Sequence, residues 1–323
     1  MDILITGAAG MVGRKLTDRL CRTGTIGGKT ISSMTLFDVV EPAAVSAPWP
    51  VEARAGDLCD PAEIDRMVAA KPDVIFHLAA IVSGEAELDF DKGYRTNLNA
   101  TLMMFEAIRA QSYCPRVVFT SSIGVFGAPY PEIISDEFLS APLSSYGVQK
   151  SCGELLLMDY SRKGFFDGIS IRLPTVMIRP GKPNKASTSF FSNILREPLV
   201  GKEAVLPVPR DLRHWYSSPR ATAGFLTHAA EVDLDAVGPR RALTMPGITA
   251  TVAELIEALG RVAGQDRVAL IREEPDAFIT RLVSSFPTRF DPARAIELGF
   301  VADQSIDEII RIHIEDELGG QLG

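Results

Sequence analysis

Tyr146 and Lys150 stand four positions apart in the stretch SSYGVQKSCGELLL, residues 144–157, at the start of an apolar run of helical character. On a helix this spacing places both side chains on one face, one turn apart. A free tyrosine titrates near pH ~10, too high for a base at neutral pH, and a nearby ammonium lowers that pKa. We therefore expect Tyr146 to act as a general base that Lys150 activates. The competing interpretation is an ordinary Tyr–Lys pair on a helix surface.

A base of this kind needs a partner that holds the substrate oxygen. The stretch PRVVFTSS, residues 115–122, reads as a strand that ends in Ser121 and Ser122. In a parallel sheet the carboxyl edge of such a strand faces the ligand. Either hydroxyl could orient a substrate alcohol while a hydride leaves its carbon. The competing interpretation is a pair of structural serines at a strand end.

A glycine-rich turn precedes these residues in the chain. TGAAGMVG, residues 6–13, contains Gly7, Gly10 and Gly13 between an apolar strand and a helix-like segment. Gly7 permits a tight turn, Gly10 lets a diphosphate approach the backbone, and Gly13 lets the helix pack closely on the sheet. The exposed amides and the helix dipole would then bind the anion. The pattern predicts a dinucleotide site.

Two acidic residues follow later strands and could select the nucleotide. Asp38 ends the strand MTLFD, residues 34–38, where a carboxylate can accept hydrogen bonds from ribose hydroxyls and repel a 2′-phosphate. This favours NAD over NADP. Asp57, in the GDL stretch at 56–58, could meet the adenine amino group or could instead cap a helix.

Strands and helices alternate through the first half of the chain. Apolar strand-like runs at 3–6, 34–38, 51–58, 73–80, 115–122 and 168–176 are separated by helical stretches. This rhythm predicts an α/β fold, a Rossmann-type doubly wound parallel sheet with ligands at the carboxyl ends of its strands. After residue 177 the regular alternation of strands and helices ends. We predict an NAD-binding domain over residues 1–177, to which some later segments return, and a smaller mixed α/β substrate domain over 178–323.

The composition excludes several other classes of protein. Lys+Arg 33 against Asp+Glu 41 gives a net charge of −8, which disfavours a nucleic-acid partner. The cysteines, Cys21, Cys59, Cys114 and Cys152, are scattered without ligand-like spacing, so we expect no metal site. The chain enters a strand at once and has no long apolar run, so we expect no signal peptide, no membrane span and a cytoplasmic location.

Taken together, these stretches resemble the extended short-chain dehydrogenase/reductase family, which includes the NAD-dependent epimerase/dehydratase group. The resemblance is carried, in order, by TGAAGMVG, GDL, HLAA (77–80), TSS and YGVQK. It implies NAD as the cofactor, Ser122 as the substrate-orienting hydroxyl, Tyr146 as the base and Lys150 as its electrostatic partner, with Ser121 open for the serine role. The expected cofactor contacts are Gly7, Gly10, Met11, Val12, Gly13, Asp38, Asp57, Leu58, Ala79, Tyr146 and Lys150.

The substrate is less clear from the sequence. Sugar-nucleotide epimerases of this family carry an asparagine where RLPT, residues 172–175, places Thr175. HLAAIVSGEAELDFDKGYRTN (77–97), RLPTVMIRPGKPN (172–184) and SSPR (217–220) are instead similar to members that oxidise a four-carbon sugar acid at C2. A carboxylate calls for a cation or several donors. The expected substrate-binding residues are Ser83, Ser122, Tyr146, Lys182, Asn184, Arg213 and Arg220.

Three functions therefore stay open. The first is a net NAD-reducing dehydrogenase of a small 2-hydroxy sugar acid. The second is an epimerase or dehydratase that returns its hydride, and the third is a redox-sensing binding protein without catalysis. The complete Ser122, Tyr146 and Lys150 set argues against the third, because a sensor needs no phenolate base. The apolar run GELLLMDY, residues 153–160, also permits a homodimer through helices.

Overall fold

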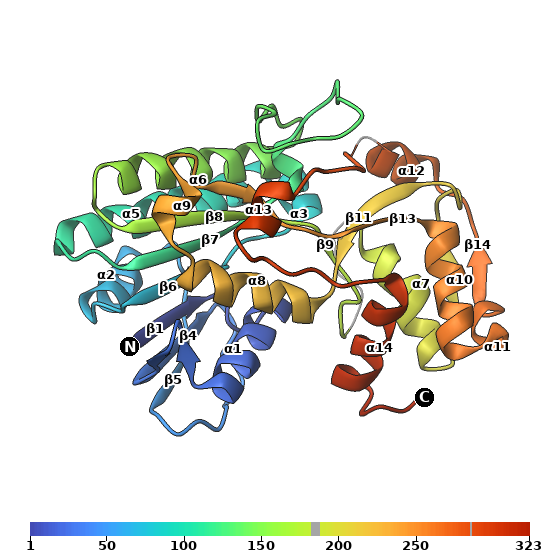
Figure 1. Ribbon diagram of the computed structural model, residues 1–323, viewed down its shortest axis with the longest axis horizontal. Helices are drawn as coiled ribbons and strands as arrows, with labels where there is room; N and C mark the ends of the chain where they lie inside the picture. The colour runs from blue at the N-terminus through green and yellow to red at the C-terminus, as the bar shows by residue number, and fades with distance from the viewer. Residues whose placement is uncertain (182–187, 285) are drawn as a thin grey trace.

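A twisted parallel sheet forms the larger part of the molecule. The computed structural model describes residues 1–181, 188–284 and 286–323. Within them, seven strands run in the order β12-β8-β7-β6-β1-β4-β5, and every neighbouring pair is parallel. The chain thus winds outward in both directions from β1, Asp2–Thr6. The predicted doubly wound α/β fold is confirmed (Figure 1).

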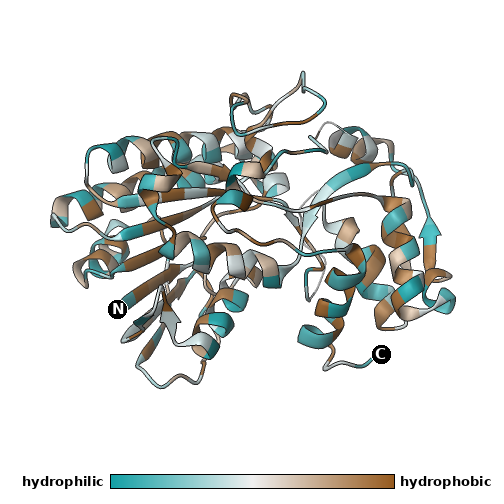
Figure 2. Cartoon of the chain, viewed as in Figure 1, coloured by the Kyte–Doolittle hydropathy of each residue, from teal (hydrophilic) through white to brown (hydrophobic). Residues whose placement is uncertain are grey.

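Helices cover both faces of this sheet. Helix α1, Met11–Thr23, packs beside α8, Pro219–Glu231, on one face, and α2, α5 and α6 form the layer on the other. The central strands read as apolar runs because both of their faces are buried. In β6, Val74–His77, every residue is buried, and Figure 2 shows the strands of the sheet as predominantly hydrophobic.

A second, smaller body lies beyond the carboxyl ends of β7 and β8 (Figure 1). Its core joins α7, α10 and α14 to the strands β9, β11 and β13. Helix α10, Val252–Ala263, begins with the predicted capping box between Thr251 and Glu254. The chain does not stay in this body. Strand β12, Ala242–Thr244, pairs with β8 at the edge of the large sheet.

The remaining elements have these bounds. The large sheet also contains β4 Ser33–Asp38, β5 Val51–Ala55, β7 Arg116–Ser122 and β8 Asp167–Leu173. The smaller strands are β2 Thr25–Ile26, β3 Lys29–Thr30, β9 Thr175–Val176, β10 Ala204–Leu206, β11 Arg213–Ser217, β13 Ile248–Thr251 and β14 Ile271–Glu273. The helices are α2 Pro61–Ala69, α3 Ser83–Leu88, α4 Phe90–Gly93, α5 Ala100–Gln111, α6 Ser145–Arg162, α7 Ser189–Leu199, α9 Leu234–Val237, α11 Gln265–Val268, α12 Ala277–Ser284, α13 Ala293–Glu297 and α14 Ile306–Glu317.

Candidate active site

A cavity of about 510 Å³ opens where the two bodies meet. One wall follows the carboxyl ends of β1, β6, β7 and β8, as expected for a ligand site in a doubly wound sheet. The opposite wall comes from the segment after β9, from β11 and from residues 286–287. We call these the cofactor wall and the substrate wall. Tyr146 and Lys150, from the start of α6, line the cavity between them.

The glycine turn forms one end of the cofactor wall. Gly7, Gly10, Met11, Val12 and Gly13 all line the cavity. Gly7 has a positive φ of 77°, and a Cβ on Gly13 would lie 2.3 Å from the Gly7 carbonyl oxygen.

The turn therefore has room for backbone alone at Gly7 and Gly13, which leaves its amides accessible. The first turn of α1 contains no acidic side chain that would compete for these amides. A dinucleotide diphosphate fits this turn, since the free N–H groups and the helix dipole both favour an anion.

The predicted adenosine contacts lie around this turn. Asp38 ends β4, and its Oδ2 accepts a hydrogen bond from the Ala9 amide at 3.0 Å, which ties the carboxylate to the glycine turn. Ala79, two residues after β6, contacts the turn, because a Cβ on Gly7 would lie 2.7 Å from the Ala79 amide nitrogen. Leu58 is buried in the core between the sheet and α2. Asp57 lies outside the cavity lining: it accepts from the Cys59 amide at 2.9 Å and pairs with Arg95.

The two candidate serines have different surroundings. Successive side chains of a strand point to opposite faces, so Ser121 and Ser122 at the end of β7 diverge. Ser121 is 3% exposed and donates to a Glu154 carboxylate oxygen at 2.5 Å. Ser122 is less buried, and its Oγ accepts from the Gly124 amide at 3.0 Å, which leaves its own proton for a second partner. Both serines line the cavity, and the hydroxyl of Ser121 is already engaged by Glu154, so the role of Ser122 stays a prediction.

Lys150 is almost fully buried where it lines the cavity. It is 2% exposed, and its Nζ donates to the Thr120 carbonyl at 2.8 Å and lies 5.8 Å from the centre of the Tyr146 ring. Burial lowers the pKa of Lys150 to about 7, and the Glu154 carboxylate one turn further along α6 opposes this shift. Glu154 is itself bonded to the Arg172 guanidinium at 2.8 and 2.9 Å. The Glu154 carboxylate, held in place by Arg172, therefore favours the protonated form of the lysine.

The electrostatics of Tyr146 differ from the sequence-based expectation. Burial raises the pKa of Tyr146 to about 12, and the groups that lower it are Arg179 and the hydrogen-bonded Ser122 hydroxyl. Arg179 follows β9 and lines the cavity on the substrate wall. In this structure the cation that favours the Tyr146 phenolate is thus an arginine on the substrate wall, while the activation of Tyr146 by Lys150 stays a prediction.

Arg179 is a cavity residue that sequence reasoning did not single out. It stands in IRPG, inside the stretch 172–184 that resembles members acting on a sugar acid, and no spacing rule connects it to Tyr146. Its position is fixed by contacts with distant residues: its amide donates to Ser192 Oγ at 3.1 Å, and Arg196 donates to its carbonyl at 2.8 Å. A signal was present all the same, because Arg179 follows closely after the strand predicted over residues 168–176, and ligands bind beyond the carboxyl ends of such strands.

The predicted substrate residues are dispersed. Ser83, at the start of α3, lines the cavity. Arg213 lies outside the lining and pairs with Glu254 at 3.6 Å. Lys182 and Asn184 lie outside the described residues.

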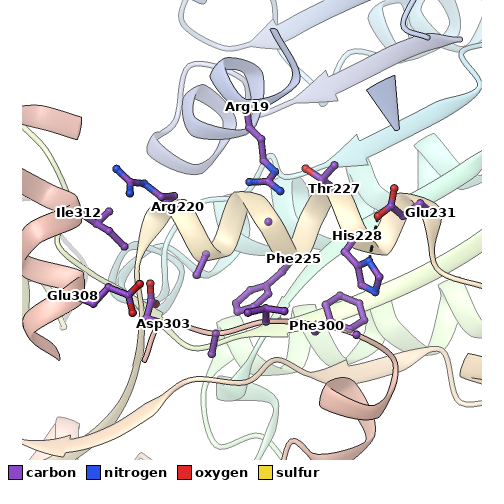
Figure 3. A pocket seen from close by; sticks show the side chains of 15 residues that line it. Arg19, Arg220, Phe225, Thr227, His228, Glu231, Phe300, Asp303, Glu308 and Ile312 are labelled. Carbon is purple, nitrogen blue, oxygen red and sulfur yellow. Dashed lines mark hydrogen bonds and ion pairs between the residues drawn. The ribbon is translucent and has the colours of Figure 1, made fainter. Parts of the chain in front are cut away.

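Arg220 lines a separate pocket between α1, α8 and the segment before α14, where it pairs with Glu315 and Asp316. Figure 3 shows it there, extending from α8. The structure therefore does not bring Arg213 or Arg220 to the cavity.

Residues 3–217 match the family described as NAD dependent epimerase/dehydratase family. The chain belongs to this family. Membership confirms the predicted family and NAD as its cofactor.

Curated relatives agree along nearly the whole chain. A D-erythronate dehydrogenase from Cupriavidus necator is 44% identical over 320 residues, which cover 98% of each chain. A D-erythronate dehydrogenase from Haemophilus influenzae is 40% identical over 318 residues, which cover 98% of this chain and 100% of that protein.

Solved structures share the fold. A crystal structure described as a nucleoside-diphosphate-sugar epimerase from Agrobacterium tumefaciens is 62% identical, with a TM-score of 0.97, and covers 100% of this chain and 96% of that one. An L-threonine 3-dehydrogenase from Trypanosoma brucei is 24% identical with a TM-score of 0.85, covers 99% of this chain and 98% of that one, and shows the fold alone.

The described residues contain neither a metal-binding cluster nor a helix that could span a membrane. No group of three or more His, Cys, Asp or Glu side chains there could hold a metal ion. In the same residues, no helix has the length and apolar character that crossing a bilayer requires.

Proposed function

We propose that this protein oxidises a small sugar acid at its C2 hydroxyl with NAD, and that D-erythronate is the substrate to test first. The observation that carries the proposal is that Tyr146 and Arg179 line one cavity, where the guanidinium also lowers the pKa of the tyrosine. In a 2-hydroxy acid the carboxylate is bonded to the carbon that bears the reacting hydroxyl. A base and a carboxylate-binding cation must therefore lie close together, and an arginine can bind such a group through two parallel hydrogen bonds.

The side chains around the reacting hydroxyl have distinct roles in this proposal. Ser122 donates to the C2 oxygen and holds it against Tyr146, and the Tyr146 oxygen takes the hydroxyl proton as the carbonyl forms. Lys150 stabilises the phenolate form of Tyr146, the form that can accept this proton. Bound NAD supplies the hydride acceptor. Arg179 fixes the carboxylate, which sets the orientation of C2 in the cavity.

Support for a sugar acid also comes from the two curated relatives, which are both named D-erythronate dehydrogenase. The alternative is an epimerase or dehydratase of a nucleoside-diphosphate sugar, which the description of the Agrobacterium tumefaciens structure favours. The two reactions differ in their net products. A dehydrogenase accumulates NADH, whereas an epimerase returns its hydride to the sugar.

The experiment is a substrate screen with the purified protein and NAD, in which NADH absorbance is followed. We expect turnover with D-erythronate, and weaker or no turnover with sugar acids that differ in length or in configuration at C2. Nucleoside-diphosphate sugars serve as the second arm, with epimerisation followed by chromatography. Epimerised sugar without net NADH, together with failure of all sugar acids, would replace the dehydrogenase proposal with the alternative.

A homodimer through α5 and α6 is a separate part of the proposal. Leu102 on α5 is 37% exposed, Leu155 on α6 is 60% exposed, and the two helices pack side by side. Exposed leucines on adjacent helices favour burial against another copy. Sedimentation equilibrium should give twice the chain mass for the wild type and the single mass for Leu155→Glu. A monomeric wild type would contradict this part alone.

A further inference from the structure

The wall opposite Ser122 contains a threonine and a histidine that the proposed mechanism does not use. Thr175 in β9 and His214 in β11 both line the cavity. His214 Nε2 lies 2.7 Å from Thr175 Oγ1. Neither residue was among those expected from the sequence to bind substrate, although Thr175 occupies the position where sugar-nucleotide epimerases of this family carry an asparagine.

The sheet and its aromatic neighbours fix the position of the histidine ring. His214 and Tyr216 point to the same face of β11, since side chains alternate along a strand. Tyr216 is opposite Thr175 in the parallel pairing of β11 with β9. The His214 ring stacks on Phe191 with 5.1 Å between ring centres and an interplanar angle of 11°. Packing therefore holds the plane of the imidazole, and Nε2 is the ring nitrogen that faces Thr175.

The surroundings of His214 exclude its charged form. The residue is 1% exposed, and burial lowers its pKa to about 3. At neutral pH the ring is uncharged and carries one proton, either on Nδ1 or on Nε2. The position of that proton decides what Thr175 can offer to a ligand.

The hydrogen-bond inventory distinguishes the two tautomers. Within the described residues, His214 Nδ1 is buried without a hydrogen-bond partner. A proton on Nδ1 would bury an unpaired N–H donor, whereas a proton on Nε2 would bury only an unpaired acceptor, and orphaned N–H donors are the rarer of the two in proteins. The Nε2–H tautomer is thus favoured. In it His214 donates to Thr175 Oγ1, and the Thr175 hydroxyl proton is left to point into the cavity.

We propose that His214 is a positioning residue that fixes the Thr175 hydroxyl as a hydrogen-bond donor to the substrate's carboxylate, beside Arg179. This inference rests on the proposed function for the identity of the carboxylate. An ionised carboxylate is an acceptor only, so a hydroxyl held as a donor is matched to it. An asparagine at the same place offers a donor and an acceptor together and suits a neutral sugar hydroxyl equally well. The Thr175–His214 pair therefore selects for an acid.

The first test reads the tautomer without a substrate. Nitrogen-15 NMR of the imidazole rings at neutral pH distinguishes a protonated from an unprotonated ring nitrogen, and the His214→Gln spectrum identifies the His214 signals by their loss. We expect a protonated Nε2 and an unprotonated Nδ1. A proton on Nδ1 would overturn the proposal, whatever the substrate of the enzyme is.

The second test uses matched variants and the sugar acid that the wild type oxidises. Thr175→Val and His214→Phe each remove one partner while keeping the shape and, for His214, the aromatic stack. We expect each to raise KM for the acid about tenfold or more, the size of a lost hydrogen bond to a charged group. The expected change in kcat is less than threefold, and NAD affinity is expected to stay the same. Two conservative variants serve as controls. Thr175→Ser keeps a hydroxyl donor, and His214→Gln keeps an N–H at the position of Nε2. Both should therefore have a KM for the acid within about threefold of the wild-type value.

The outcomes separate this inference from the proposed function. A wild-type KM in His214→Phe, or no rescue by His214→Gln, would overturn the positioning role even if the sugar acid is the substrate. Failure of every sugar acid with the wild type would overturn the carboxylate assignment together with the proposed function, and the NMR result would still decide the Thr175–His214 arrangement. If His214→Phe does not fold, as judged by circular dichroism and NAD binding, Thr175→Val decides the kinetic arm.

Discussion

The cofactor wall and the substrate wall of the cavity are built in different ways. At its glycine turn, the cofactor wall is made of backbone packed so closely that a Cβ on Gly13 would lie 2.3 Å from a carbonyl oxygen. The substrate wall is made by side chains from segments that are distant in sequence, such as Arg179, His214 and Phe286. A wall of backbone tolerates little change and suits a ligand shared by a whole family. A wall of side chains can be altered one residue at a time, which is where substrates diverge.

The largest expected effect lies where the two walls meet. Tyr146→Phe removes the proposed base but keeps the ring, so turnover of the sugar acid should fall by at least ~100-fold, as is typical for loss of a general base. NAD affinity, measured by calorimetry, should change little. Near-normal turnover would remove Tyr146 from this role.

A substitution on the cofactor wall should affect every substrate alike. Gly13→Ala forces α1 away from the glycine turn, and overpacking of about 1–3 kcal/mol corresponds to an NAD affinity lower by about tenfold to 100-fold. The matched control is Gly224→Ala in α8, where an added Cβ meets nothing within 4 Å. Equal NAD affinity in the two variants would contradict the description of a wall made of tightly packed backbone.

A substitution on the substrate wall should instead leave NAD binding intact. Arg179→Gln should raise KM for the sugar acid by about tenfold or more, because a hydrogen-bonded charge is lost. Because Arg179 lowers the pKa of Tyr146, its removal raises that pKa, and the rise of kcat/KM with pH should move to higher pH. Arg210→Gln, which removes an exposed arginine paired with Glu273, is the control for both measurements. An unchanged pH profile in Arg179→Gln would show that the two walls are not coupled through this charge.

The preference for NAD over NADP is expected to change less than the quantities above when its proposed determinant, Asp38, is substituted. Asp38→Asn keeps an oxygen that can accept from the Ala9 amide but removes the negative charge, so the preference for NAD over NADP should narrow by about tenfold through lost repulsion of the 2′-phosphate. The ratio of kcat/KM values with the two nucleotides measures this. A ratio equal to that of the wild type would place the selectivity elsewhere.

The smallest expected effect concerns the pH dependence of the free energy of unfolding, to which the large sheet and the substrate wall each contribute one buried histidine. Burial lowers the pKa of His77 in the large sheet and of His214 on the substrate wall to about 3. A free histidine titrates near pH ~6.5, so below that pH the unfolded chain binds more protons than the folded one, and the free energy of unfolding falls as the pH falls. Each such histidine should contribute a slope of about 1.4 kcal/mol per pH unit.

Urea unfolding at two values between pH 4 and pH 6 would test this slope. His214→Gln should lower the slope by the share of one histidine if the two regions unfold together. An unchanged slope would show that His214 is not neutral in the folded state, or that the substrate region unfolds separately.

The features that could be predicted from the sequence belong mainly to the cofactor wall and to α6, whereas those that could not belong mainly to the substrate wall. The sheet, the glycine turn, the strand-end serines and the Tyr146–Lys150 helix depend on local spacing, and local spacing is visible in a single sequence. Arg179 and the Thr175–His214 contact depend on which loops the tertiary fold brings together. The proposal of Arg220 shows the difficulty: it directly follows Pro219 at the start of α8, close in sequence to β11, and yet its partners are Glu315 and Asp316 on α14. Burial also reversed the expected direction of the Tyr146 pKa, and burial cannot be read from spacing.

The path of the chain through α8 and β12 has a consequence for recombining proteins of this kind. Helix α8 buries Phe225, Leu226 and Ala229 against the large sheet, although it follows most of the substrate wall in the sequence. A fragment that ends at residue 177 would leave that face of the sheet open to water, and we expect it to aggregate rather than fold as a portable nucleotide-binding module. Substrate preference should therefore be transplanted between relatives as individual side chains on the intact chain, and not by exchanging one half of the protein for another.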